Sequence, residues 1–573
     1  MRILLVASAF NSLTQRVFGE LRDRGHHPGV HLMTVEGERT AADGLREAVR
    51  RQRPDLILAP MLKSAVPEDI WAGCPTLIVH PGPPGDRGPA SLDWAIQEGA
   101  ERWGVTVLQA NAVLDGGDIW AHAECPVPPV GKSELYRGEV ADAALRAVLL
   151  AVERFAAGRH QPRPQHGSGW DVPDHTRPAL RQADRRIDWS ADPTATVLRK
   201  LRAADSQPGV LDELLGAEWY LHGGHGEDQL RGRPGSLLAT RAGAVCRATV
   251  DGAVWLPELR ARRAPDGRRG IKLPATVALG SRCPVLPEVA APLVLPPGRR
   301  TWTDLDYREV GAVGMLRFAF PGGAMSAAHC RRLLAAYRFA RTRPTSVLVL
   351  GGGRDFFSNG IHLNVIEAAP DPAAESWENI TAIDDLVAEL LTTTDRLLVA
   401  ALGGNAAAGG AMLALAADEV WCRSGVVLNP HYRLMGLTGS EYWTYSLPRR
   451  VGPDAARRLT EQALPLSAAA AQRLGLVDRL LPVPPGEFAG EVAALAGRLA
   501  ASPGLGERIG LKKAARERDE AVKPLAAYRA EELALMRRTF EDPQAPYHAL
   551  RAAFVRKEPA VGTPEHLARH QAR

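Results

Sequence analysis

Two polar residues in the first quarter of the chain have the chemistry needed to move an acyl group. His80 ends an apolar run and enters the Pro/Gly-rich segment VHPGPPGDRGP, and Asp115 heads a turn made by Gly116 and Gly117. An imidazole can polarise a carbonyl and carry protons while a tetrahedral centre forms and collapses, and a carboxylate can hold that imidazole. The pair is therefore a candidate for acyl-transfer chemistry. Taken alone, a histidine in such a turn is more often structural.

Two glycine-rich turns further along the chain predict a second site. Residues 351–363 read GGGRDFFSNGIHL and residues 403–413 read GGNAAAGGAML, each after an apolar run. Such turns expose backbone N–H groups at a helix start, and two converging N–H groups form an oxyanion hole for a thioester carbonyl. Nucleotide phosphate binding and plain turns are the alternatives. The first turn is not a Walker A loop, because no GK[ST] follows it.

The elements that would position the first pair alternate between strands and helices. Thr14–Arg24 has helical periodicity. Short apolar runs predict strands at Arg2–Ala7, Asp55–Ala59, Thr76–Val79 and Val105–Gln109. The alternation predicts an α/β fold with a mostly parallel sheet. We expect His80 and Asp115 at the ends of neighbouring parallel strands, in the crevice where such sheets bind ligands.

The rest of the chain divides by composition into a β-rich module, a second α/β region and a helical tail. Residues 158–174 are rich in His, Pro and Gly and predict a linker, and residues 284–297 are rich in proline. Short runs with glycine turns predict strands between these segments. Strands are also expected at Val347–Leu350 and Leu397–Leu402. We expect three domains, which cover residues 1–157, 175–280 and 298–573.

Composition narrows the partners and the compartment. The 573 residues carry a net charge of +5, from 70 basic and 65 acidic residues, which predicts neither a nucleic-acid nor a membrane partner. The six cysteines form no CxxC pair, so neither a metal site nor a redox dithiol is predicted. The first apolar run is too short for a membrane span and lacks a cleavage site. Small-molecule substrates and a cytoplasmic location are therefore expected.

The segment around His80 resembles the folate-dependent formyltransferases, whose signature is Asn-x-His-Pro-Ser-x-x-Pro followed by an Asp-x-Gly turn. His80 and Asp115 match the catalytic His and Asp, whereas Ile78 and Gly82 replace the Asn and the Ser. The resemblance implies a Rossmann-like parallel sheet and 10-formyl-tetrahydrofolate as the formyl donor. The missing Asn removes an amide donor, so the acceptor can differ from an amine. The implied folate-binding residues are Met61, Leu62, Lys63, Ser64 and Ala65.

The middle module resembles the small, OB-like β-barrel domain that follows many formyltransferases. The matching segments are Ile187–Trp189 and Lys200–Val210. We interpret Asp188 and Trp189 as structural residues of this domain.

The two glycine-rich turns, together with LPRRVG at 447–452, resemble the crotonase (enoyl-CoA hydratase/isomerase) superfamily. The resemblance implies a spiral ββα domain with a helical tail, and coenzyme A as a ligand. It assigns the oxyanion amides to Asn359 or Gly360, and to Gly409. The two glutamates of the hydratases are absent, because their positions hold Met412 and either His431 or Tyr432. In the first glycine-rich turn, His362 replaces an aspartate that is usual in the family. Tyr432 and Glu441 are the remaining polar candidates for proton transfer, and surface or packing roles are about as plausible.

Nearly the whole chain resembles the HypX-type hydrogenase-maturation proteins. That family implies formyl transfer from 10-formyl-tetrahydrofolate to CoA, and then decarbonylation of formyl-CoA to carbon monoxide for the iron of [NiFe]-hydrogenase. Other hydrogenase-maturation proteins are possible partners. Two alternatives stay open: formyl transfer to an amine of a sugar nucleotide or similar acceptor, and a non-catalytic CoA-binding scaffold in metallocentre assembly.

The residues agree with a formyl thioester on one point. Formyl-CoA has neither an α- nor a β-carbon, so a site that acts on it has no use for the two hydratase carboxylates. In the expected second step, Glu441 or Tyr432 takes the formyl proton while the C–S bond breaks. The candidates for binding the CoA phosphates are Arg354, Arg449, Arg450, Arg551 and Arg556.

Overall fold

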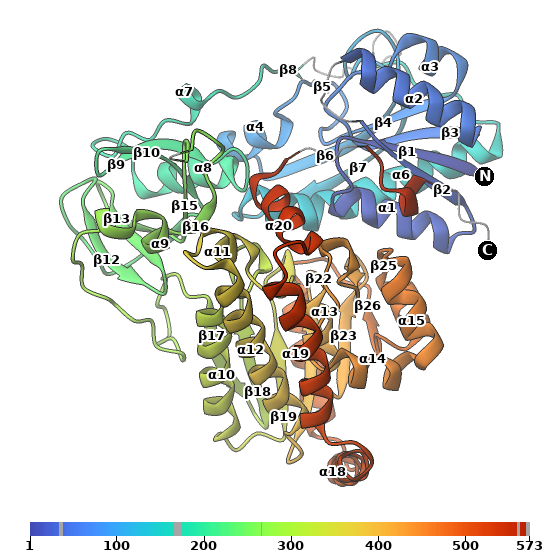
Figure 1. Ribbon diagram of the computed structural model, residues 1–573. Coiled ribbons are helices and arrows are strands. Elements are labelled where there is room, and N and C mark those ends of the chain that lie inside the picture. The colour runs from blue at the N-terminus through green and yellow to red at the C-terminus, as the bar shows by residue number, and fades with distance from the viewer. Residues whose placement is uncertain (34–37, 166–174, 265, 559–561, 569–573) are drawn as a thin grey trace. The chain divides into compact units, whose positions relative to one another are not determined.

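A computed structural model describes residues 1–33, 38–165, 175–264, 266–558 and 562–568 (Figure 1). The chain forms two compact units. The first unit contains residues 1–186, 199–210 and 558–573, and the second contains residues 187–198 and 211–557. The β-rich module therefore belongs to the same unit as the second α/β region. None of the described helices has both the length and the hydropathy that crossing a bilayer requires.

The first unit is built on a six-stranded sheet of order β2-β1-β3-β4-β6-β7. Its strands are β1 (Arg2–Ala7), β2 (His27–Leu32), β3 (Leu56–Met61), β4 (Thr76–His80), β6 (Arg102–Gln109) and β7 (Ile119–Pro126). The strands expected from the sequence are therefore confirmed within a few residues at each end. The first four strands are parallel, whereas β6 runs antiparallel to β4 and β7 antiparallel to β6.

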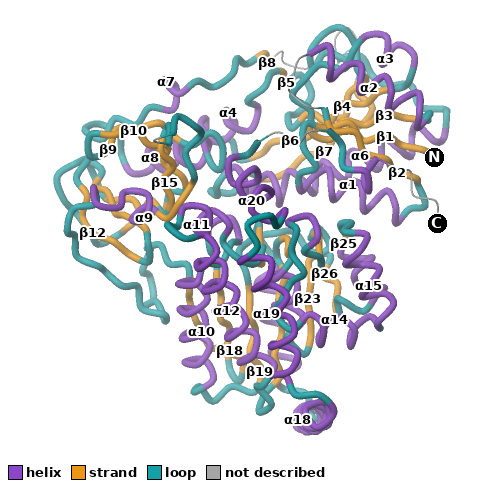
Figure 2. Tube along the Cα trace, in the orientation of Figure 1, coloured by secondary structure: helices purple, strands orange, loops and turns teal. Residues whose placement is uncertain are grey.

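Helices cover both faces of this sheet (Figures 1 and 2). The helix expected over 14–24 is α1 (Ser12–Asp23), which starts where Asn11 caps it by accepting a hydrogen bond from the Thr14 N–H (3.0 Å). Helices α2 (Glu38–Gln52) and α3 (Glu68–Gly73) enclose one apolar core with β1 and β3. Helix α6 (Ala141–Ala157) packs with α1 and against β6 and β7.

The middle module consists of two four-stranded sheets, of orders β16-β15-β10-β9 and β11-β14-β13-β12. Its strands are β9 (Val210–Leu214), β10 (Ala217–His222), β11 (His225–Glu227), β12 (Leu237–Arg241), β13 (Ala244–Ala248), β14 (Ala253–Leu256), β15 (Glu258–Ala261) and β16 (Lys272–Pro274). The strands that the glycine turns predict are confirmed. Trp189 is structural here, since its Nε1–H donates to Asp212 (2.9 Å) under the Arg247 guanidinium.

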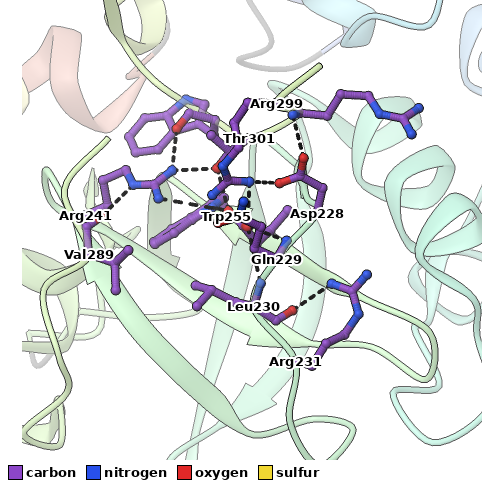
Figure 3. A network of polar contacts seen from close by, with 12 residues as sticks. Asp228, Gln229, Leu230, Arg231, Arg241, Trp255, Val289, Arg299 and Thr301 are labelled. Atoms are coloured by element: carbon purple, nitrogen blue, oxygen red, sulfur yellow. Dashed lines mark hydrogen bonds and ion pairs between the residues drawn. The ribbon is translucent and has the colours of Figure 1, made fainter. Parts of the chain in front are cut away.

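A buried polar network holds the proline-rich segment that follows against this module (Figure 3). The Glu227 carboxylate accepts hydrogen bonds from Thr301, from the Trp255 indole (2.8 Å) and from Arg299 (3.1 Å). Arg241 donates to the carbonyl oxygens of Val289 and Trp302, each at 2.7 Å. The segment expected to mark a domain boundary is thus attached by charged hydrogen bonds.

The second α/β region has a six-stranded sheet of order β17-β18-β19-β21-β23-β26, which is parallel from β18 onward. Its strands are β17 (Leu305–Val310), β18 (Val313–Phe318), β19 (Val347–Gly351), β21 (Leu397–Leu402), β23 (Glu419–Arg423) and β26 (Arg479–Leu481). Alternate residues of β19 and β21 enter two different cores, one on each face of the sheet. A strand buried on both faces is apolar throughout, which explains the continuous runs in the sequence.

Three helices stand side by side over one face of this sheet: α10 (Ala327–Arg341), α12 (Pro372–Leu391) and α19 (Leu525–Glu541) (Figure 1). The other face is covered by α17 (Phe488–Ala500) and the start of α18 (Leu505–Val522). A smaller sheet contains β20 (Phe356–Ser358), β22 (Asn405–Ala407), β24 (Val427–Asn429) and β25 (Leu466–Ser467). The tail is helical as expected, and continues with α20 (Pro546–Arg556) and α21 (Glu565–Ala568).

Candidate active sites

His80 lies at the end of β4 with carboxylates at both ring nitrogens. Its Nε2 is 2.8 Å from Asp86 Oδ2, and its Nδ1 is 3.5 Å from Asp115 Oδ2. The structure thus places the two residues singled out in the sequence close together. It adds Asp86, which sequence reasoning missed, although this residue lies within the quoted Pro/Gly-rich segment. The imidazole and Asp86 are buried, with 4% and 2% of their surfaces exposed.

The strand that leads to Asp115 is antiparallel to β4, so the expectation of two neighbouring parallel strands is wrong. The pairing aligns His80 with Thr106 and Leu77 with Gln109. Asp115 lies in the connection between β6 and β7, and this connection folds back so that the Asp115 carboxylate reaches His80. Its own φ is +52°, and the side-chain amide of Gln165 donates to the carbonyl oxygens of Asp115 and Gly117, both at 2.8 Å. Gln165 carries no sequence signal that would have revealed this contact.

The loop expected to bind the pterin follows β3 at the carboxyl edge of the parallel strands. Met61 ends β3, and its carbonyl oxygen accepts from the Ser8 N–H (2.9 Å). The Ser8 hydroxyl in turn accepts from the Lys63 N–H (2.9 Å). Lys63, Ser64 and Ala65 are exposed. The loop offers a backbone edge beside the end of β1, which is where parallel sheets bind ligands.

Ile78 takes the position at which formyltransferases carry an amide. Its partly buried side chain packs against the apolar core beneath α2 and α3. The side chain therefore supplies no hydrogen-bond donor, and the polar groups at this end of β4 are His80 and its two carboxylates.

The second site lies where two glycine-rich turns meet. Gly409 begins helix α13 (Gly409–Leu415), so its N–H has no acceptor within the helix. The turn at Gly360 approaches closely, because a Cβ on Gly360 would lie 3.1 Å from the Gly409 nitrogen. Both candidate amides in that turn already donate, Asn359 to the Gly323 carbonyl (2.7 Å) and Gly360 to Ser358 Oγ (3.1 Å). Of the three candidate amides, Gly409 is the one left for a ligand.

Glu441 and Tyr432 form a buried pair beside Gly409. A Cβ on Gly409 would come within 3.0 Å of the Glu441 carboxylate, so the carboxylate faces this turn directly. Glu441 Oε2 accepts hydrogen bonds from Tyr432 Oη (2.6 Å) and from the Ser440 N–H (3.2 Å). Glu441 is 1% exposed and Tyr432 is 7% exposed. The structure thus brings together the two polar candidates that the sequence left open.

Two further carboxylates hold the turn that carries Glu441. Asp384 of α12 accepts from the Glu441 N–H (2.8 Å) and the Ser440 hydroxyl. Glu532 of α19 accepts from the N–H groups of Tyr442 (2.9 Å) and Thr444 (2.8 Å). Sequence reasoning missed both residues. Asp384 does leave a signal, because an acidic residue four positions after Ile380 falls on the buried stripe of α12.

Burial controls the protonation of this carboxylate cluster. Burial, and then the charge of Asp384, raises the pKa of Glu441 to about 8. Burial likewise raises the pKa of Asp384 to about 6 and that of Glu532 to about 7. Burial and the charge of Glu441 also raise the pKa of Tyr432. At neutral pH Glu441 is therefore largely protonated, and it becomes a base in mildly alkaline solution.

The residues at the positions of the missing family carboxylates are buried. Met412 is fully buried in the core on the face of the sheet that α10 and α12 cover. His362 caps helix α11 (Leu363–Ala368), since its Nδ1 accepts from the Val365 N–H (3.3 Å). Burial lowers the pKa of His362 to about 4, so it is neutral. His431 is buried next to Tyr432 in the sequence.

Most of the arginines proposed for the CoA phosphates form ion pairs. Arg449 pairs with Asp519 (2.5 Å) and Arg450 with Asp478 (2.6 Å). Arg551 and Arg556 share Glu367, at 2.9 Å and 3.1 Å. A phosphate would have to displace these carboxylates, so the structure singles out none of them.

Comparisons with known proteins identify related domains in both parts of the chain. The formyl transferase model matches residues 1–152, its C-terminal domain model residues 179–266, and the enoyl-CoA hydratase/isomerase model residues 310–559. The chain is 47% identical to the hydrogenase maturation factor HoxX of Bradyrhizobium diazoefficiens, over 100% of this chain and 98% of that protein. The methionyl-tRNA formyltransferase of Roseiflexus castenholzii is 29% identical over 40% of this chain and 74% of its own.

A solved structure matches the whole chain. HypX from Aquifex aeolicus, in complex with tetrahydrofolic acid, is 42% identical and superposes with a TM-score of 0.94. The match covers 100% of this chain and 99% of that one.

Proposed function

Because the chain belongs to the family of the hydrogenase maturation factors HoxX and HypX, with formyltransferase and enoyl-CoA hydratase-like domains, we propose that it makes carbon monoxide from a formyl group. In the first reaction, 10-formyl-tetrahydrofolate and CoA give tetrahydrofolate and formyl-CoA. In the second, formyl-CoA gives carbon monoxide and CoA, and the carbon monoxide becomes the ligand of the hydrogenase iron.

The first unit suits the formyl transfer. The loop from Met61 to Ala65 offers a backbone edge for the pterin, and the related HypX structure contains tetrahydrofolic acid. His80 can take the thiol proton as the thiol attacks the formyl carbon. Ile78 supplies no amide donor, so the site differs here from the amine-specific formyltransferases, and His80 is the group that can return a proton to the folate nitrogen as that nitrogen leaves.

The second unit suits the breakdown of formyl-CoA. The Gly409 N–H can hold the thioester oxygen, with the turn at Asn359 and Gly360 opposite it. Glu441, hydrogen-bonded to Tyr432, then takes the formyl proton while the C–S bond breaks, and the proton passes to the thiolate. The observation that carries this proposal is the buried Glu441–Tyr432 pair on Gly409, at a site whose hydratase carboxylates are missing.

The experiment is incubation of the purified full chain with 10-formyl-tetrahydrofolate, with and without CoA, while reduced haemoglobin traps carbon monoxide. We expect carbon monoxide only when CoA is present. Formylation of an added amine without need for CoA would instead support a formyltransferase of another specificity. Absence of any turnover would favour a scaffold role.

Two variants test the residue assignment. Glu441→Gln and Tyr432→Phe should each lower the rate of carbon monoxide release from supplied formyl-CoA by roughly 10²–10⁴-fold, the usual contribution of a positioned acid or base. Both should still convert 10-formyl-tetrahydrofolate and CoA to formyl-CoA, which would accumulate. Unchanged carbon monoxide release in both variants would exclude this pair as the proton-transfer groups.

A further inference from the structure

The two carboxylates at His80 are not equivalent. The 2.8 Å contact of Nε2 with Asp86 is a hydrogen bond, whereas the 3.5 Å separation of Nδ1 and Asp115 is too long for a good one. Asp115 is also engaged elsewhere, because its Oδ2 accepts from the Gly88 N–H (3.1 Å). Asp86 is therefore the residue that sets the state of the imidazole ring.

The hydrogen bond to Asp86 determines which nitrogen carries the proton. An ionised carboxylate can only accept a hydrogen bond, so the proton lies on Nε2. In the neutral ring the other nitrogen, Nδ1, then has a free lone pair. Nδ1 is thus the nitrogen that can accept a proton from a substrate.

Gly82 makes this contact possible. A Cβ at this position would come within 3.0 Å of both Asp86 Oδ2 and His80 Nε2, a separation that real Cβ atoms essentially never show. The backbone of Gly82 is not in the left-handed region, so its conformation does not itself require glycine. The need for space between Asp86 and His80 is therefore the reason for a glycine here, where the formyltransferase signature has a serine.

The fold fixes Asp86 from several sides. Its strand β5 (Asp86–Arg87) pairs with β8 (His175–Thr176), and its own N–H donates to the Pro83 carbonyl (3.0 Å). The Arg177 guanidinium lies 3.9 Å from Asp86 Oδ1 and also pairs with Glu98 (2.9 Å). Because these contacts fix Asp86 in the loop after β4, its carboxylate can orient the His80 imidazole without touching a substrate.

We propose that Asp86 is a positioning residue of the formyl-transfer site, which holds His80 in the Nε2–H form so that Nδ1 serves as the base. The inference rests on the proposed formyl transfer to CoA. As the S–C bond forms on the formyl carbon, the thiol proton moves to Nδ1. When the tetrahedral centre collapses, the bond from carbon to the folate nitrogen breaks and Nδ1 returns the proton to that nitrogen. Asp115 faces the transient positive charge.

The test measures the proton position and the reaction separately. Full-length protein with ¹⁵N-labelled histidine is studied by long-range ¹H–¹⁵N correlation, with His80 assigned from its loss in His80→Gln. We expect the proton on Nε2 in the wild type and a mixture of both forms in Asp86→Asn. The kcat of formyl-CoA formation should fall by roughly 10²–10⁴-fold in this variant, with the KM for CoA little changed.

Gly82→Ala provides a second route to the same result, because its methyl group would push Asp86 away while leaving every polar group present. The matched control is Gly73→Ala at the end of α3, where an added Cβ meets nothing within 4 Å. We expect Gly82→Ala to disturb the His80 proton and the transfer rate, and Gly73→Ala to disturb neither.

Two outcomes would overturn the inference: a proton on Nδ1 in the wild type, or an unchanged rate in both Asp86→Asn and Gly82→Ala. Failure of the proposed function is recognised differently. In that case the wild-type protein would make no formyl-CoA, even if NMR places the proton on Nε2. The hydrogen bond to Asp86 would then still set the tautomer, but it would have no role in formyl transfer.

Discussion

At the scale of single residues, the two proposed proton-transfer groups, His80 and Glu441, lie in opposite electrostatic environments. His80 is flanked by two carboxylates, and the closer one determines where its proton lies. The Glu441 carboxylate is buried and lies near other acids, and burial, followed by the charge of Asp384, raises its pKa to about 8. A raised pKa makes the carboxylate a stronger base once it is ionised, which removal of a formyl proton requires.

The pH dependence of carbon monoxide release tests this environment. Glu441 must be ionised to act as a base, so the rate with supplied formyl-CoA should rise with pH through about 8. Asp384→Asn removes a negative charge but keeps an oxygen that can accept from the Glu441 N–H. The pKa of Glu441 should then fall, and the midpoint of the kcat profile should move to lower pH.

The neighbouring residue provides the control for this prediction. Asp385 is exposed and pairs with Arg529 (2.5 Å). Asp385→Asn should leave the midpoint almost in place, because solvent screens its charge. Equal shifts in the two variants would show that the effect is one of net charge and not of the buried cluster.

At the scale of elements, turns and caps bring the reactive groups together more than regular structure does. The Glu441 turn contains two successive residues with positive φ, Glu441 (+62°) and Tyr442 (+56°), which are costly for side chains with a Cβ. Helices α12 and α19 compensate by supplying Asp384 and Glu532 to the N–H groups of the turn. Side-chain hydrogen bonds also attach the proline-rich segment, where Arg241 donates to the Val289 carbonyl (Figure 3).

The Glu227 network should stabilise the fold in a pH-dependent manner. Burial alone would raise the pKa of Glu227, but hydrogen bonds from Thr301, Trp255 and two backbone N–H groups outweigh it and lower the pKa to about 2. The stabilisation is therefore present above the ordinary glutamate pKa of about 4.3 and is lost as the pH falls toward 2.

Thermal unfolding of Glu227→Gln measures this contribution. We expect a loss of about 2 kcal/mol at neutral pH, as for a buried charged hydrogen bond, and a lower Tm. The difference from wild type should narrow below about pH 4. Glu218→Gln, which breaks an exposed pair with Arg262 in the same module, should change the Tm little. A Tm difference between wild type and Glu227→Gln that stays the same from pH 7 down to pH 2 would contradict the prediction.

At the scale of the whole molecule, each of the two units contains one complete set of polar groups. His80, Asp86 and Asp115 belong to the first unit, and Gly409, Tyr432 and Glu441 belong to the second. Each proposed reaction can therefore be abolished by a substitution that leaves the other set of groups intact.

Complementation by mixing tests this separation. A His80→Ala variant should release carbon monoxide from supplied formyl-CoA but not from 10-formyl-tetrahydrofolate. Glu441→Gln should make formyl-CoA from 10-formyl-tetrahydrofolate but release little carbon monoxide from either substrate. A mixture of the two variants should restore carbon monoxide from 10-formyl-tetrahydrofolate and CoA after a lag, which headspace analysis records. No recovery from a mixture of two half-active variants would mean that formyl-CoA does not leave the protein that makes it.

The sequence by itself determined the α/β class, the strands, the HypX-type family and several of the polar residues. Continuous apolar runs and glycine turns are local signals, and they place strands and loops without reference to distant parts of the chain. The Pro/Gly-rich segment and the glycine turn drew attention to His80 and Asp115, whereas the resemblance to the crotonases implied Gly409 and left Tyr432 and Glu441 as candidates for proton transfer.

Only the tertiary structure decided how these residues combine. The antiparallel course of β6, the Asp86 contact and the Asp384 and Glu532 contacts all join residues through strand pairing or helix packing. The pattern of apolar and polar residues along the chain cannot predict that Asp384 and Glu532 contact the turn that carries Glu441. The engaged Asn359 and Gly360 amides are a further case, because hydrogen-bond partners depend on the three-dimensional path of the backbone.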